Sequence, residues 1–135
     1  MRRRKQRREK PFEVKRGDIF MADLGDEVDV VGSEQFGIRP IVVTQSNRQN
    51  LSSTTIIIAV ITSEIKKERM NTHVILPKIE GLPKQSMVCA EQRFTIDKVR
   101  LLEYRCTLSK KIMKKVTRAC HKAEQAERTR KRRYW

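Results

Sequence analysis

Short apolar segments separated by polar turns run through most of the chain. The least interrupted segment, residues 55–62, is apolar between its two terminal threonines, which predicts a strand covered on both faces at the centre of the core. Similar but shorter patterns predict strands at 17–24, 40–45, 72–77 and 86–92, a candidate sixth strand at 101–108, and a turn at 46–50. Five or six short strands at this spacing are typical of a compact, highly curved sheet or a small barrel.

The last apolar pattern has helical instead of strand spacing. Ser109 is a suitable N-cap, and the apolar residues that follow it recur on one helical face while Lys and Arg fill the other. The apolar positions are Ile112, Met113, Val116, Ala119, Cys120 and Ala123. We therefore expect a mostly β fold with one terminal amphipathic helix that covers a side or an end of the sheet.

A polar loop, Gly-Ser-Glu-Gln-Phe-Gly-Ile-Arg-Pro at 32–40, separates the first two strands. Gly32 and Gly37 lie five residues apart, a spacing that fits neither a helix nor a regular strand, so we expect a mobile loop. Pro40 restricts Arg39 to an extended backbone and directs its guanidinium from the first residue of the strand. A functional arginine in a loop of this kind is one interpretation, and a solvated surface arginine is the alternative.

The excess of positive charge lies mainly at the two ends of the chain. Of a formal net charge of +15, residues 1–16 contribute nine Lys and Arg against two acids, and residues 121–135 contribute six against two. We expect a disordered basic arm at 1–13, one folded domain at 14–123 and a basic tail at 124–135. Such ends attract a polyanion through salt-dependent contacts, or remain solvated without a specific partner.

Two further classes of feature are expected to be absent. No apolar run reaches the ~18 residues of a membrane span, and no apolar stretch follows the N-terminal charges, so we expect a cytoplasmic chain without membrane association. Cys89, Cys106 and Cys120 are odd in number and lack C-x-x-C spacing, which disfavours both a disulfide framework and a zinc site. The acidic residues at 26–34 match no calcium loop, and we expect no metal and no other cofactor.

Five motifs occur in the order seen in one known family. They stand at 14–20, 32–40, 59–63, 72–74 and 91–97, and the match spans roughly residues 14–120. In this order they resemble the MazF/PemK/Kid-type toxins of type II toxin–antitoxin systems. The resemblance implies a small SH3-like (CcdB/MazF-type) β-barrel with a C-terminal helix, a homodimer, and a cognate antitoxin that occupies the RNA groove. It also implies a metal-independent endoribonuclease that cuts single-stranded mRNA at short sequences.

The resemblance also assigns roles to particular residues. Arg39 matches the family's catalytic arginine and Thr62 matches the hydroxyl that works with it. Ser33, Glu34 and Gln35 fall in the loop that touches RNA or antitoxin in similar toxins. The remaining candidates for substrate binding are Ser63, Gln92 and Arg93.

Two positions depart from the family pattern. Ser33 stands where some relatives carry a histidine, so no imidazole is expected there. Phe94 stands where the family usually has an arginine, and the chain has Arg93 one place earlier. In a strand, a shift of one residue points the side chain to the opposite face, and we expect an altered cleavage sequence as a result.

RNA cleavage without a metal uses the neighbouring 2′-hydroxyl as the nucleophile, and the usual acid and base would be two histidines. His73 and His121 are both expected to be structural. The planar fork of Arg39 suits stabilisation of the phosphorane, with Thr62 orienting the scissile phosphate. Glu34 is one candidate acceptor of the 2′-hydroxyl proton, and the residues leave that assignment open.

Two alternatives from other classes remain. The low aromatic content of 5% and the basic ends fit a non-catalytic RNA-binding protein that contacts the phosphate backbone. A related toxin branch on the same fold poisons DNA gyrase through its C-terminal residues, and this chain ends in Tyr134 and Trp135. Retention of Arg39 and Thr62 favours the nuclease over both.

Overall fold

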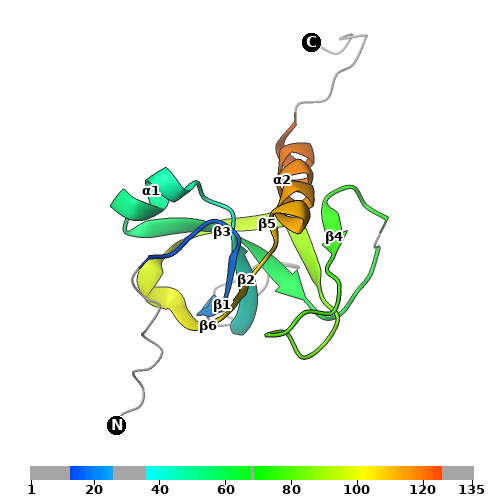
Figure 1. Cartoon of the computed structure of the whole chain (residues 1–135), viewed down its shortest axis with the longest axis horizontal. Coiled ribbons are helices and arrows are strands. Elements are labelled where there is room, and N and C mark those ends of the chain that lie inside the picture. Colours follow the sequence, from blue (N-terminus) through cyan, green and yellow to red (C-terminus); the bar gives the residue numbers. More distant parts are fainter. Residues whose placement is uncertain (1–12, 26–35, 68, 126–135) are drawn as a thin grey trace.

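The computed structural model describes residues 13–25, 36–67 and 69–125. Its six strands form one antiparallel sheet in the order β4-β5-β3-β2-β1-β6, and α2 (orange) lies over the end of the sheet formed by β5 and β4 (Figure 1). The strands are β1 (Asp18–Asp23), β2 (Ile38–Val43), β3 (Thr55–Thr62), β4 (His73–Ile75), β5 (Met87–Asp97) and β6 (Leu101–Thr107). The helices are α1 (Asn47–Ser52), the short 3-10 helix η3 (Lys98–Arg100) and α2 (Lys110–Glu124). All six expected strands are therefore present.

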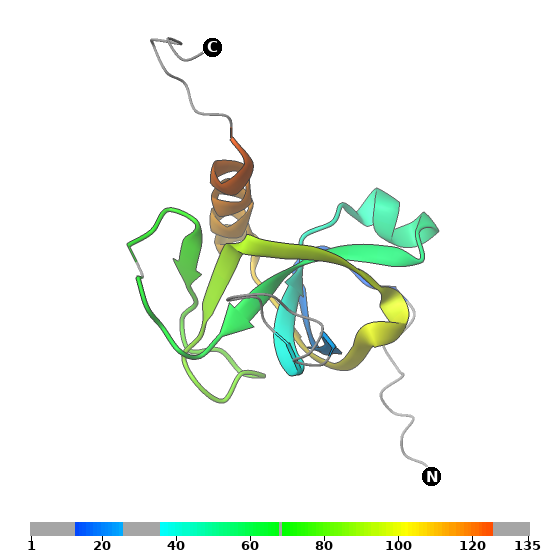
Figure 2. The same cartoon turned by 180° about the vertical axis from the view of Figure 1, so that it is seen from behind.

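The longest strand, β5, gives the sheet its curvature. It pairs with β3 in two registers, since Ala59 lies opposite Arg93 while Val60 lies opposite Cys89. Three residues of β5 therefore bulge out between these pairs, and a bulge bends a strand and increases its twist. Figure 2 shows β5 curving from the β4 side of the molecule to the end where α1 and η3 lie. The strand expected at 86–92 was too short, because the bulge interrupts the alternation of side chains and the sequence pattern gave no sign that the strand continues to Asp97.

Buried side chains form a cluster on each face of the sheet. The helix-side cluster packs between the sheet and α2 and includes Val42, Ala59, Ile61 and Val116. The second cluster lies on the face away from α2, where the sheet curls upon itself, and includes Phe20, Ile41, Ile58 and Val60. β3 contributes alternate residues to both clusters, which confirms the expectation that residues 55–62 are covered on both faces.

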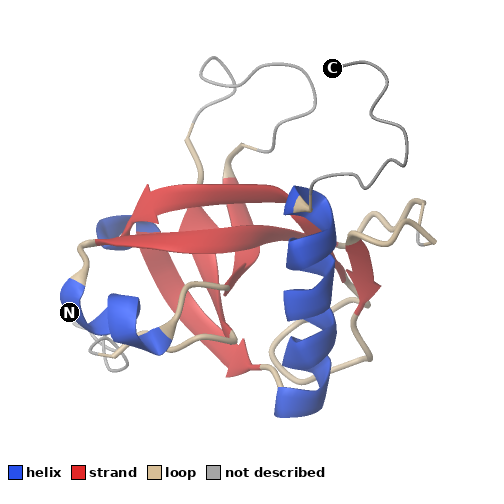
Figure 3. Ribbon diagram, turned by 90° about the horizontal axis from the view of Figure 1, so that it is seen from above, coloured by secondary structure: helices blue, strands red, loops and turns tan. Residues whose placement is uncertain are grey.

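Helix α2 forms as its sequence pattern predicts. The Ser109 side chain accepts a hydrogen bond from the Ile112 amide at 3.2 Å and so caps the first turn. The buried residues Met113, Val116, Ala119 and Cys120 lie on one face of the helix. Seen from above, α2 runs along one side of the strands (Figure 3).

The expected turn at 46–50 is instead the start of α1. The Ser46 hydroxyl accepts a hydrogen bond from the Gln49 amide at 3.3 Å, which caps a helical turn. Asn50 is buried in that turn and its side chain exchanges hydrogen bonds with Gln45 at 2.9 and 3.1 Å. Hydrogen bonds between neighbouring polar residues thus stabilise a short helix where the composition of the segment indicated only a turn.

The ladder of strands ends at β4 on one edge and at β6 on the other. The segment between β4 and β5 reaches across to β6, and Leu82 from this segment is buried in the helix-side cluster with Leu108. At Gly81 the approach is so close that an added Cβ would lie 2.7 Å from the Arg105 carbonyl oxygen. A loop contact, instead of a further ladder of hydrogen bonds, therefore brings the two edges together.

Within the described ranges, no helix has the length and apolar character needed to cross a membrane. The expected basic ends at 1–13 and 124–135 lie almost wholly outside these ranges.

Candidate functional site

Arg39 and Thr62 stand on neighbouring strands at the same level of the sheet. The β2–β3 ladder pairs Val43 with Ile58 and Ile41 with Val60, and the same register extended by two residues sets Arg39 opposite Thr62. Because side chains alternate along a strand, both share the face of the second cluster with Ile41 and Val60. Side chains directly opposite one another have Cβ atoms about 4.5–5.5 Å apart. By this extended register, the two residues predicted to be catalytic lie opposite one another.

The Arg39 side chain is held at the base of the 26–35 loop. Its Nε donates a hydrogen bond to the Phe36 carbonyl at 3.0 Å, and its guanidinium carbon lies 6.0 Å from the centre of the Phe36 ring. Below it, Gly37 closes the base of the loop by exchanging backbone hydrogen bonds of 2.8 Å with Leu24 and Gly25. Among the described residues, the two terminal nitrogens of Arg39 have no further hydrogen-bond or ion-pair partner. Within the described ranges they are therefore available to bind the two oxygens of a phosphate.

Thr62 ends β3, and its hydroxyl has one donor already in place. Oγ1 accepts a hydrogen bond from the Glu64 amide at 3.0 Å, which is the turn-forming contact typical of a threonine at a strand end. That contact uses the oxygen as an acceptor and leaves the hydroxyl hydrogen able to donate to a ligand oxygen. The structural role and the expected chemical role of Thr62 are therefore compatible. Ser63 follows it and is exposed.

Arg93 lies on the other side of the sheet. It pairs with Ala59, a member of the helix-side cluster, and its guanidinium forms an ion pair with Glu124 near the end of α2. Phe94 pairs with Ile58 and packs against the second cluster. The side chain that shares a face with Arg39 is therefore Phe94, as the one-place shift in the sequence suggested.

Gln92 immediately precedes Arg93, in the bulged stretch of β5. Its side chain is half-buried, and Oε1 accepts no hydrogen bond from the described residues. A buried acceptor without a partner carries a free-energy cost, and such atoms often contact a ligand. Ser33, Glu34 and Gln35, the other predicted contacts, lie outside the described residues.

Sequence reasoning missed two contacts around this site. The first is the hydrogen bond from Arg39 Nε to the Phe36 carbonyl, a backbone contact that no pattern of side chains in the sequence indicates. The second is the pair of His73 and Glu91, whose Nε2 and Oε2 lie 2.9 Å apart across β4 and β5. Burial alone would raise the pKa of the Glu91 carboxyl, but the hydrogen bond to His73 leads the effects that lower it, and the net shift is downward. Both residues stood in sequence motifs, at 72–74 and 91–97, but their spacing gave no sign of a contact.

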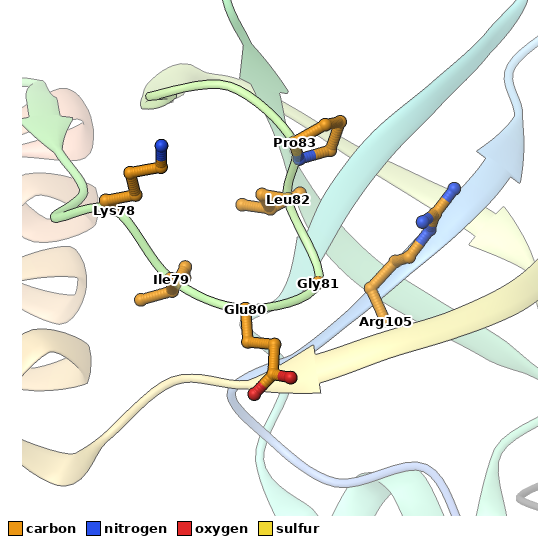
Figure 4. A pocket seen from close by; sticks show the side chains of 7 residues that line it. All are labelled: Lys78, Ile79, Glu80, Gly81, Leu82, Pro83 and Arg105. Atoms are coloured by element: carbon orange, nitrogen blue, oxygen red, sulfur yellow. The ribbon is translucent and has the colours of Figure 1, made fainter.

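A cavity of about 490 Å³ lies at the loop that joins the two sheet edges. Figure 4 shows Arg105 rising from β6 beside Leu82 and Pro83, while the Glu80 carboxylate points away from Lys78. None of the residues predicted from the sequence lines it. The pair of Arg39 and Thr62 is therefore the better candidate for the site.

Comparison with known proteins assigns the chain to a family. Residues 15–123 match the family described as PemK-like, MazF-like toxin of type II toxin-antitoxin system. The chain belongs to this family. Two relatives are each 45% identical over 107 residues, which is 78% of this chain: endoribonuclease MazF of Staphylococcus saprophyticus, covered over 87% of its length, and endoribonuclease EndoA of Bacillus subtilis, covered over 90%. The expectation that this toxin-family chain is an endoribonuclease is confirmed.

Solved structures of similar shape confirm the fold. A crystal structure of MazF from Deinococcus radiodurans has a TM-score of 0.71 at 19% identity, with 85% of this chain and 99% of that chain covered. An endoribonuclease from mycobacterial species in complex with its cognate antitoxin has a TM-score of 0.69 at 20% identity, covering 85% and 98%. The mostly β, MazF-type architecture with a C-terminal helix is therefore as expected.

Proposed function

We propose that this toxin cleaves single-stranded mRNA at a short specific sequence without a metal ion, through attack of the 2′-hydroxyl next to the scissile phosphate. It acts in the cytoplasm as a homodimer, and a cognate antitoxin inhibits it by covering the RNA groove. The observation that carries the proposal is the β2–β3 register, which, extended two residues beyond the Ile41–Val60 pair, sets Arg39 opposite Thr62 on one face.

The two side chains suit different parts of this reaction. As the bond from the 2′-oxygen to phosphorus forms, negative charge grows on the nonbridging oxygens, and the terminal nitrogens of Arg39 stabilise it. The Thr62 hydroxyl donates to the same phosphate and fixes its orientation. The 2′-hydroxyl gives its proton to a base, for which Glu34 is one candidate. The bond to the 5′-oxygen then breaks, that oxygen takes up a proton from an acid or from water, and the products are a 2′,3′-cyclic phosphate and a 5′-hydroxyl.

Residues around this pair supply contacts to the flanking nucleotides. We assign Ser63 and Gln92 to RNA binding, together with the loop residues Ser33, Glu34 and Gln35. Arg93 belongs to the same expected set, but contact with RNA would require its ion pair with Glu124 to open. Phe94 occupies the nearby face instead, where an apolar ring changes which bases fit.

The test is to incubate the purified chain with a long single-stranded RNA in EDTA and to map the new ends. We expect discrete cuts that leave a 2′,3′-cyclic phosphate and a 5′-hydroxyl. Arg39→Ala should lower the rate about 10²- to 10³-fold, as expected for loss of one preorganised charge-stabilising donor. The matched control is Arg48→Ala, an exposed arginine of α1, which should cleave normally.

Several outcomes would contradict the proposal. Normal cleavage by Arg39→Ala would remove the catalytic assignment, and cleavage lost in EDTA but restored by a divalent ion would remove metal independence. RNA that binds but stays intact would favour the non-catalytic binding protein. Inhibition of gyrase supercoiling with intact RNA would favour the gyrase poison.

A further inference from the structure

Three side chains that commonly bind metal ions meet on β4 and β5. The potential ligand atoms of His73, Cys89 and Glu91 all lie within 4.8 Å of one another. The strand register explains this, because His73 lies directly opposite Cys89 and Glu91 follows Cys89 by two residues on the same face. Paired strands, and not a flexible loop, therefore position the three groups.

The histidine is oriented as a metal ligand usually is. Its Nδ1 lies 2.9 Å from the Lys67 carbonyl oxygen, which can only accept, so Nδ1 carries the hydrogen of that bond. The same carbonyl accepts the Met70 amide at 3.0 Å, which fixes the turn that leads to His73. A backbone carbonyl on one ring nitrogen sets the tautomer and leaves the other nitrogen available for a metal.

The remaining nitrogen faces an acceptor. With Nδ1 protonated, Nε2 of a neutral ring holds a lone pair, yet it lies 2.9 Å from the Glu91 carboxylate oxygen. A cation between them, either a proton or a metal ion, is needed to make that contact favourable. Ligand atoms on tetrahedral zinc lie about 3.3–3.6 Å apart, given bond lengths of roughly 2.0–2.3 Å. Because the three atoms lie within 4.8 Å of one another, relative shifts of at most about 1.5 Å would give that spacing.

We propose that His73 Nε2, Cys89 Sγ and a carboxylate oxygen of Glu91 bind one Zn²⁺ ion per chain. Nitrogen, thiolate and carboxylate are the ligands typical of zinc in proteins, and the thiolate disfavours magnesium and calcium. Solvent supplies the fourth ligand from the Glu91 side, because that side chain is 35% exposed while the His73 side chain is 7% exposed.

The ion lies beside the proposed RNA site and not within it. Thr62 pairs with Met87, so Cys89 is its diagonal neighbour across β3 and β5, at a separation of about 7–8 Å. The zinc site and the proposed function are independent of one another, because the proposed cleavage proceeds in EDTA, where the zinc site would be empty. Failure of one proposal therefore leaves the other standing.

Cobalt is a suitable probe because its spectrum reports both geometry and sulfur ligation. The full chain is stripped with EDTA, kept reduced, and titrated with Co²⁺. We expect tetrahedral d–d bands and a thiolate-to-cobalt charge-transfer band that saturate at one equivalent, and their loss when Zn²⁺ is added. Cys89→Ser should remove the charge-transfer band and weaken Zn²⁺ binding at least about a hundredfold, since loss of an outer-shell partner alone costs 10- to 100-fold.

The chain provides matched controls. Cys106→Ser changes another free cysteine, on β6, and should leave the spectrum unchanged. Glu91→Gln keeps the size of the side chain and should weaken zinc binding while the charge-transfer band persists, so it serves if Cys89→Ser does not fold. A charge-transfer band that survives in folded Cys89→Ser would overturn the proposal, as would octahedral cobalt without sulfur ligation or zinc affinity unchanged in Glu91→Gln.

Discussion

Neighbouring residues hold both the backbone and the side chain of Arg39 in place, so the position of its guanidinium depends on them. Pro40 follows it, and the strand pairs Arg39 with Ala22, so the backbone is extended. The Phe36 carbonyl then accepts a hydrogen bond from Nε, and no other described residue binds the outer nitrogens of the guanidinium. A charge held this way needs little reorganisation when a phosphate arrives, which is the condition for effective electrostatic catalysis.

Substitution of Thr62 separates its structural role from its chemical role. Thr62→Val removes a hydrogen bond to a charged phosphate, worth about 1.5–3 kcal/mol, and should lower the cleavage rate about 10- to 100-fold. The Glu64 amide loses its acceptor but lies in an exposed turn, so the free energy of unfolding should fall by no more than about 1 kcal/mol. Single-turnover cleavage and urea unfolding measure the two effects.

Thr55→Val is the control, since Thr55 is exposed at the other end of the same strand. It should cleave RNA normally. If Thr62→Val unfolds the protein while Thr55→Val does not, Thr62 is a structural cap and its catalytic assignment is wrong.

At the scale of elements, the contact between Gly81 and β6 holds the two sheet edges together. Gly81 has a φ of +104°, and an added Cβ would meet the Arg105 carbonyl and the Cys106 side chain. Gly37 has a φ of +81° but open space around it. The two glycines thus share a left-handed backbone, in which another residue would be strained, and they differ in packing.

Gly81→Ala should therefore lower the free energy of unfolding more than Gly37→Ala does. We expect about 1–2 kcal/mol from the left-handed backbone in each variant, and about 1–3 kcal/mol more from the clash at Gly81. Urea denaturation of both variants measures the difference. Equal losses would show that the segment between β4 and β5 moves away from β6 freely.

At the scale of the whole molecule, the excess of positive charge is concentrated at the two ends of the chain. Residues 1–10 carry seven Lys and Arg. Their deletion should weaken RNA binding at low salt at least tenfold and make the salt dependence shallower, by up to about 0.7 in log–log slope for each phosphate that the arm neutralises. The cleavage positions should stay the same, because these contacts carry no sequence information.

An arm of the same composition in scrambled order is the control for that deletion. It should restore the affinity, since a sequence-blind attraction depends on charge alone. Unchanged affinity after deletion, measured by titration over a range of salt concentrations, would show that the arm is solvated and makes no contact with RNA.

Local patterns in the sequence predicted most of the elements and the proposed catalytic pair. The spacing of apolar residues, the glycines between segments and the Ser109 cap depend on near neighbours, so they predicted six strands and helix α2. The order of the motifs identified Arg39 and Thr62 as candidate site residues. Polar residues in α1 and the bulge in β5 escaped prediction, because the hydrogen bonds and pairings that stabilise them are not visible as a periodic pattern.

Only the tertiary structure decided which distant side chains meet. The register of β2 on β3 sets Arg39 level with Thr62, the bulge in β5 directs Arg93 to α2 and Phe94 to the other face, and β4 brings His73 to Cys89. The physical reason is that strand pairing joins residues far apart in the chain. A shift of one residue in the register of a strand moves each of its side chains to the opposite face of the sheet. A site that depends on contacts between distant residues is determined by the sequence, but it can be identified only from the tertiary structure.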